Sequence, residues 1–110
     1  MGTNYFCREK TRNLQERHIG KKSYGWTFIF HGHEKTEYGL KSNLKNYVEW
    51  KKYLLSKNVE VYEESGKKVN TSKFLVMIEA SLSEGKHIVK NDENEWIDEE
   101  GFVFLNYWFC

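Results

Sequence analysis

Aromatic side chains alternate along one stretch of the chain, and this pattern restricts the fold more than any other feature of the sequence. Tyr24, Trp26, Phe28 and Phe30 occupy every second position of residues 24–30. Every second side chain of an extended strand points to the same face, so the four rings share one side. Burying them would stabilise the fold at about 25 cal/mol per Å² of apolar surface. The sequence therefore predicts a central strand over 24–30 whose aromatic face builds the core.

Glycines bracket the segment that precedes this strand. Residues 20–25 read Gly-Lys-Lys-Ser-Tyr-Gly, and glycine is frequent where a chain turns. We expect a loop here that joins a strand at 17–19 to the aromatic strand as a hairpin. The basic and hydroxyl side chains of this loop could hold an anion, or the loop could only turn the chain. It is not a nucleotide-binding P-loop, because Gln15 stands where the motif requires glycine.

Helical and extended patterns follow one another in the rest of the chain. Apolar residues recur at helical spacing over 43–56, and a second amphipathic pattern runs from residues 70–72 to a stop at Gly85. Alternation predicts a strand at 59–63, and 102–110 is apolar enough for a final strand. We predict a single α+β domain over 1–110, with a mostly antiparallel sheet of four to six strands and two helices packed on one face.

Charge and composition exclude several classes of protein. The 17 basic and 16 acidic side chains give a formal net charge of +1, so no global field attracts a nucleic acid or a membrane surface. We find no apolar run of the length of a membrane span, and expect no membrane association. The two cysteines, Cys7 and Cys110, form no C-x-x-C pair, which favours free thiols in a reducing cytoplasm.

Three histidines near the aromatic stretch raise the question of a metal site. His31 and His33 flank a glycine, and His18 or Cys7 could provide a third ligand if a hairpin brings them together. Cys7 could also pair with His18 or His31 for nucleophilic catalysis. No motif supports either chemistry, and surface or hydrogen-bonded histidines are the favoured explanation of the pattern. We therefore expect no metal, no cofactor and no catalytic residues, and whether the three histidines bind a metal stays open.

Basic side chains concentrate in the first third of the chain, beside the first aromatic residues. Single-stranded nucleic acids are bound by such combinations of cations and stacking rings. An acidic run at 92–100 would repel phosphates if it lay close by. The candidate residues for binding a ligand or a nucleic acid are Arg12, Arg17, His18, Lys21, Lys22, Ser23 and Trp26.

Aromatic residues make up 16% of the chain, more than a core of this size requires, so some rings should be exposed for contact with a partner. An acidic loop at 92–100 could dock on a basic surface or imitate DNA phosphates. The apolar strand at 102–110 could pair with another chain and form a homodimer. The candidate residues for partner contact are Trp50, Tyr53, Trp96, Asp98, Glu99, Glu100 and Trp108.

Two motifs near the N-terminus resemble those of a known group of proteins. The first is Met-Gly-Thr-Asn-Tyr at 1–5, and the second is His-Ile-Gly-Lys-x-Ser-x-Gly-Trp-x-Phe-x-x-His at 18–31. Together they resemble a group of small, uncharacterised proteins encoded by phages. In those relatives a C-x-x-C pair between the motifs looks like half of a zinc site, but this chain lacks it. The resemblance implies a phage origin and a host-cell cytoplasmic location, and it brings no established activity.

These observations lead to one principal hypothesis and two alternatives. We expect a non-catalytic protein that binds or inhibits a host protein, in host takeover or counter-defence. The first alternative is a nucleic-acid-binding protein that uses the basic N-terminal third. The second is a metal-dependent enzyme at His18, His31 and His33. The sequence leaves the partner and the oligomeric state open.

Overall fold

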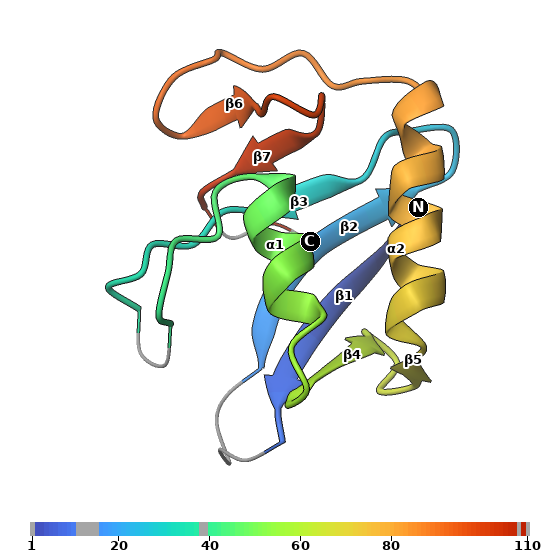
Figure 1. The fold of residues 1–110 in the computed structure, drawn as a ribbon. Helices are drawn as coiled ribbons and strands as arrows, with labels where there is room; N and C mark the ends of the chain where they lie inside the picture. The colour runs from blue at the N-terminus through green and yellow to red at the C-terminus, as the bar shows by residue number, and fades with distance from the viewer. Residues whose placement is uncertain (1, 11–15, 38–39, 108, 110) are drawn as a thin grey trace.

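The computed structural model describes residues 2–10, 16–37, 40–107 and 109. It shows a mixed β-sheet with two helices on one of its faces (Figure 1). The strands are β1 (Gly2–Glu9), β2 (Arg17–Ser23), β3 (Ile29–His31), β4 (Val59–Glu63), β5 (Lys68–Val69), β6 (Glu95–Ile97) and β7 (Val103–Leu105). The helices are α1 (Tyr47–Leu54) and α2 (Thr71–Ala80), and the 3₁₀ turn η1 (Ser81–Ser83) follows α2 directly.

The sheet has seven strands in the order β5-β4-β1-β2-β3-β7-β6. Neighbouring strands run antiparallel except β3 and β7, which are parallel, with Ile29 opposite Val103. The α+β class and the two helices are confirmed, but the sheet is larger than predicted and is mixed. β7 is paired with β3 on one side and with β6 on the other, so residues 103–105 offer no open edge to a second copy. The homodimer through the C-terminal segment 102–110 stays a prediction.

The predicted loop at 20–25 is partly wrong, because β2 continues through Ser23. Lys21 pairs with Asn4 of β1 and also with Ile29 of β3. A Cβ atom at Gly20 would lie 2.0 Å from the carbonyl oxygen of Ile29, so only glycine allows β3 to approach β2 this closely. The segment predicted to hold an anion is therefore a paired strand.

The predicted aromatic strand at 24–30 is correct only for its second half. Phe28 and Phe30 are fully buried, whereas Tyr24 is 97% exposed and Trp26 is 42% exposed. The chain turns between them, because Gly25 has a φ of 82° and the Trp26 N–H donates to the carbonyl of Ser23 over 3.1 Å. The alternation of aromatic residues thus begins before β3, in the turn that follows β2.

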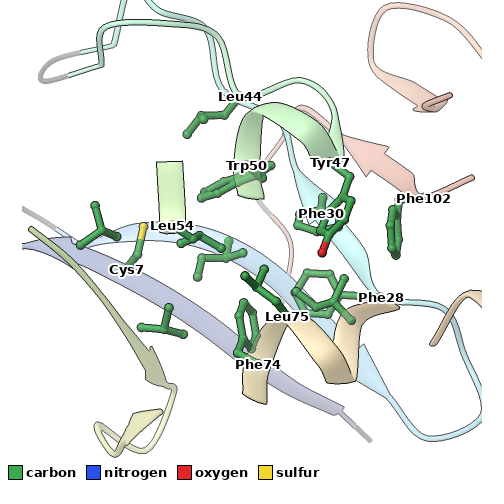
Figure 2. Packing of buried hydrophobic residues seen from close by; sticks show 14 of the residues in the cluster. Cys7, Phe28, Phe30, Leu44, Tyr47, Trp50, Leu54, Phe74, Leu75 and Phe102 are labelled. Carbon is green, nitrogen blue, oxygen red and sulfur yellow. The ribbon is translucent and has the colours of Figure 1, made fainter. Parts of the chain in front are cut away.

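Both helices pack their apolar sides onto one face of the sheet, where Phe28 and Phe30 lie between them and the strands (Figure 2). Asn46 and Asn70 begin the two helices, each accepting a hydrogen bond from a backbone N–H of the first turn. Trp50 of α1 is fully buried, and its indole N–H donates to the carbonyl of His31 over 3.1 Å. Its predicted contact with a partner is therefore wrong, because helical spacing turns it inward with Tyr47 and Leu54.

The acidic run at 92–100 contains β6, so it is not only a solvated loop as predicted. Asp98 is buried, and its carboxylate accepts the N–H groups of Tyr47 and Phe102. A role for Asp98 in partner contact is wrong, because this side chain joins the start of α1 to the start of β7. No helix in the described part of the chain is long and apolar enough to cross a membrane.

Candidate functional site

Three histidine rings meet at the sheet, and we call them, with Asn4 and Glu37, the histidine cluster. His18 comes from β2, and His31 from the end of β3. The Nδ1 atoms of His18 and His31 are 2.9 Å apart, and the rings of His31 and His33 stack with centroids 4.3 Å apart. The hairpin of β2 and β3 brings these histidines together as predicted, and all three are buried.

The hydrogen-bond partners determine which nitrogen of His18 and His31 carries a proton. His18 Nε2 lies 2.8 Å from Asn4 Oδ1, an oxygen that can only accept, so the ring donates from Nε2. A neutral His18 then accepts at Nδ1, and His31 must donate from its own Nδ1. The bonds therefore run in one direction, from His31 through His18 to Asn4, and both rings are neutral.

His33 differs because both of its ring nitrogens face acceptors. Its Nδ1 lies 2.8 Å from Glu37 Oε1, and its Nε2 lies 2.9 Å from the carbonyl oxygen of His18. Both hydrogen bonds can form only if the ring carries two protons, so His33 and Glu37 form an ion pair. Arg17 also pairs with Glu37, with 3.4 Å between Nη1 and Oε1. The cluster thus holds one charged ring beside two neutral ones.

The surroundings oppose a second positive charge in the cluster. Burial, and next the positive charge of His33, lower the pKa of His18 to about 4. The same two causes lower the pKa of His31 to about 3. At neutral pH these rings contribute hydrogen bonds and packing, including edge contacts with the ring of Phe109.

The geometry does not support a metal centre at the three histidines. Nitrogens that share one zinc ion lie roughly 3.3 Å apart in a tetrahedral site, whereas His18 Nδ1 and His31 Nδ1 are 2.9 Å apart and share a proton. Within residues 2–10, 16–37, 40–107 and 109, no group of three His, Cys, Asp or Glu side chains is placed to hold a metal ion.

Cys7 is separated from the histidines by the sheet. It belongs to the apolar core beneath the helices, and its neighbour in β1, Phe6, lies opposite His18 on the other face. Burial raises the pKa of the Cys7 thiol to about 12, so it is protonated at neutral pH. The Cys–His pair considered from the sequence does not form with this residue.

A second region has the opposite character, with apolar side chains in solvent. Tyr24 and Trp26 follow β2, and His87 and Ile88 follow η1. Tyr24 is 97% exposed and Ile88 is fully exposed, and the rings of Trp26 and His87 stack with centroids 4.7 Å apart. We call these four residues the Trp26 surface. The side chains of Tyr24 and Ile88 bury almost no surface in the folded chain, so they add little to its stability.

Backbone pairing holds the Trp26 surface rigidly. The N–H of Thr27 donates to the carbonyl of Gly85 over 2.7 Å, and Gly85 donates back to Gly25 over 3.1 Å. A Cβ atom at Gly85 would lie 3.2 Å from the ring of Trp26, so the indole rests against this glycine. The buried hydroxyl of Thr27 bonds to the carbonyl of Ser81. The two segments therefore present their side chains in a fixed arrangement.

The structure brings only part of the predicted ligand site together. Lys21, Lys22 and Ser23 end β2 next to Trp26, whereas Arg17 and His18 lie at the start of that strand. Lys22 already pairs with Glu84 at 3.3 Å. Arg12 lies outside the described residues. The basic third of the sequence is thus not one continuous patch in the described part of the chain.

The predicted partner residues are also divided. Tyr53 is half-buried and donates its hydroxyl to Glu9, and Trp96 is half-buried and donates its indole N–H to the carbonyl of Lys45. Glu99 and Glu100 are exposed. Trp108 lies outside the described residues. Trp50 and Asp98 are buried, so among the members that the structure describes Glu99 and Glu100 alone are exposed.

Two members of the Trp26 surface, Tyr24 and Ile88, were missed as binding candidates. Alternation predicts Tyr24 in the core, where it does not lie, and Ile88 belongs to a segment that forms no strand. The Gly25 turn was the available signal for Tyr24, since a residue next to a turn is often exposed.

Comparison with protein-family models, with curated proteins and with solved structures found no match for this chain. Its function is therefore argued from the two regions described above.

Proposed function

We propose that this chain is a small phage protein that binds a host protein without catalysis, and that the Trp26 surface is its contact. The observation that carries the proposal is the exposure of Tyr24 and Ile88, which lie close along the chain to the two stacked rings of Trp26 and His87. Large apolar side chains gathered in solvent are typical of binding surfaces, and tryptophan and tyrosine dominate the energy of many interfaces.

The rigidity of this surface supports a role in recognition. Binding costs less free energy when the contact residues are ordered beforehand. Here the hydrogen bonds between Thr27, Gly85 and Gly25 fix the backbone from which the side chains project. The phage origin rests on the two N-terminal motifs, and a host target is the partner that this origin favours.

A capture experiment followed by a measured affinity tests the proposal. Immobilised protein is incubated with host lysate, and the retained protein is purified and titrated by calorimetry. The double variant Tyr24→Ala/Ile88→Ala should weaken binding at least tenfold, because two exposed apolar contacts are lost. Its free energy of unfolding should stay within about 0.5 kcal/mol of the original, because neither side chain is buried.

Val76→Ala is the matched control, because Val76 is an exposed aliphatic residue of α2 outside the Trp26 surface. This variant should bind the captured protein with unchanged affinity. Equal affinity of the double variant and the original chain would rule out the Trp26 surface as the contact.

Nucleic-acid binding is the second candidate, because Lys21 and Lys22 lie beside Trp26. The pairing of Lys22 with Glu84 weakens it, since that charge is already neutralised within the chain. If it is correct, a single-stranded oligothymidine should quench tryptophan fluorescence, and the affinity should fall steeply with salt. Absence of quenching at low salt would eliminate this candidate and leave the protein-binding proposal in place.

A further inference from the structure

A groove of about 560 Å³ opens on the helix-bearing side of the molecule. It lies between α1 and the segment formed by α2, η1 and the turn before β7, and we call it the α1–α2 groove. Val48, Leu55, Leu82 and Phe102 provide apolar lining. Tyr47 and four charged side chains share this lining, so apolar and charged groups face the groove together.

Val48 of α1 and Leu55, which directly follows this helix, expose apolar side chains to solvent at this groove. Val48 is 60% exposed and Leu55 is 56% exposed. They are seven positions apart along the chain, which is about two helical turns, so they lie along the same side of the helix. A lone exposed aliphatic residue needs no explanation, but an aligned pair beside a groove forms a stripe that a second helix could cover.

Both helices lie on the same face of the sheet (Figure 1). Tyr47 and Lys51 of α1 both reach Glu79 of α2, so the two helices are joined across the groove. A helix of a partner would therefore lie on top of α1 and α2, against the exposed side chains of Val48 and Leu55.

The charges around the groove indicate what that helix must carry. Lys51 of α1 reaches across to Glu79 of α2, with Nζ and Oε2 3.1 Å apart, so these two charges neutralise each other. Lys52 and Glu100 also line the groove, one from α1 and one from the turn before β7. Neither makes an ion pair within the described residues. A ligand would therefore meet a positive edge on one side and a negative edge on the other.

We propose that the α1–α2 groove binds an amphipathic helix of a partner protein, with aliphatic side chains on its buried face, an acidic residue at Lys52 and a basic residue at Glu100. This inference extends the proposed binding function by giving it a second contact. The groove adjoins the Trp26 surface through η1, because Leu82 lines the groove and the segment after η1 carries His87 and Ile88. One partner could therefore contact both.

Designed peptides test the proposal on the full chain. Three capped peptides of about four helical turns carry leucine at every third or fourth position. One has glutamate on one edge and lysine on the other, one has glutamate on both edges, and one has lysine on both. The mixed peptide should bind about fivefold more tightly than the other two, because only it can match both edges, in one of the two directions in which it can lie. Affinities come from NMR titration, in which methyl signals of Val48, Leu55 and Leu82 should shift.

Variants locate the contact and test the role of charge. Val48→Asp/Leu55→Asp should weaken binding of the mixed peptide at least tenfold, whereas Val76→Asp on the exposed side of α2 should not change it. Lys52→Glu makes both edges acidic, so the peptide with lysine on both edges should become the tightest ligand. Tyr24→Ala/Ile88→Ala should leave peptide binding unchanged, which separates this test from that of the Trp26 surface.

Several results would overturn the inference. They are the absence of binding by all three peptides, signal changes confined to residues outside the groove, and a ranking of the peptides that Lys52→Glu leaves unaltered. A concentration-dependent dimer that perturbs the same methyl groups would show instead that a second copy of the chain occupies the groove.

Discussion

The histidine cluster and the Trp26 surface reverse the usual distribution of side chains in opposite ways. The cluster buries polar rings, and the Trp26 surface exposes apolar ones. In the cluster, hydrogen bonds from His31 to His18 and from His18 to Asn4 offset the cost of removing the rings from water. At the Trp26 surface nothing in the described chain offsets the exposure of Tyr24 and Ile88. A buried polar or an exposed apolar side chain therefore indicates a partner only where no contact within the fold offsets its cost in free energy.

If this contrast is correct, the cluster should govern stability and the Trp26 surface should govern binding. Changes to the cluster should leave the affinity for the partner captured through the Trp26 surface unchanged as long as the chain is folded.

Acid should cause the largest loss of stability. In the unfolded chain both histidines bind a proton below about pH 6.5, whereas in the folded chain His18 does so only near pH 4 and His31 only near pH 3. The unfolded state therefore binds more protons as the pH falls from 6.5, and the stabilising contribution of the neutral rings is lost between pH 6.5 and 3. We expect a decrease on the order of 5 kcal/mol from the two rings together, measured by urea unfolding.

Carboxylates also titrate in acid, so ring signals must identify the histidines. Nitrogen-15 NMR of the imidazoles should show His18 and His31 neutral in the folded protein at pH 5.5. Protonation of His18 or His31 at pH 5.5 in the folded chain would contradict the assignment of two neutral rings.

Replacing His18 by leucine should have the next largest effect. The variant His18→Leu keeps a similar volume but leaves Asn4 Oδ1 without its donor and His31 Nδ1 without its acceptor. Each buried polar group that loses its partner costs about 1–3 kcal/mol, so we expect a loss of about 3 kcal/mol in the free energy of unfolding. Ile19→Val, one position along the same strand, is the control and should cost about 1 kcal/mol. A loss no greater than that of the control would mean that the ring bonds add little to stability.

Removing the charge that faces His33 should have the smallest effect of the three. Glu37→Gln keeps the shape of the side chain but takes away the negative charge beside His33. We expect a loss of about 1 kcal/mol at pH 7, because Glu37 is partly exposed and water replaces part of the interaction. Glu34→Gln, in the exposed pair with Lys45, should change stability by less than about 0.5 kcal/mol. Equal effects of the two variants would argue against a doubly protonated His33.

Local patterns in the sequence predicted the fold where they depended on near neighbours. The strand at 59–63 follows directly from alternation of Val59 and Val61, and Asn70 is recognisable as the cap of α2. Prediction failed where a distant segment decides the outcome. The exposure of Trp26 depends on its pairing with Gly85, and the burial of Trp50 depends on the sheet that the helix covers.

The candidate sites show the same limit. The three histidines could be singled out from their spacing, but their protons are assigned by Asn4 and Glu37, which only the register of β1 with β2 and the turn after β3 bring into place. Ile88 carries no local signal for binding, because a single aliphatic residue in a polar segment is common. Its significance depends on the stack of Trp26 and His87 beside it.

The parallel pairing of β3 with β7 has a consequence for synthesis of the chain. Residues 29–31 leave the ribosome early, but their hydrogen-bonding neighbours at 103–105 emerge only after both helices have been made. Until then one side of β3 has no strand to bond, and pairing across so long a separation is slow to form. The nascent polypeptide must therefore keep this edge from aggregating, and completion of the sheet is an event that follows translation of residue 105.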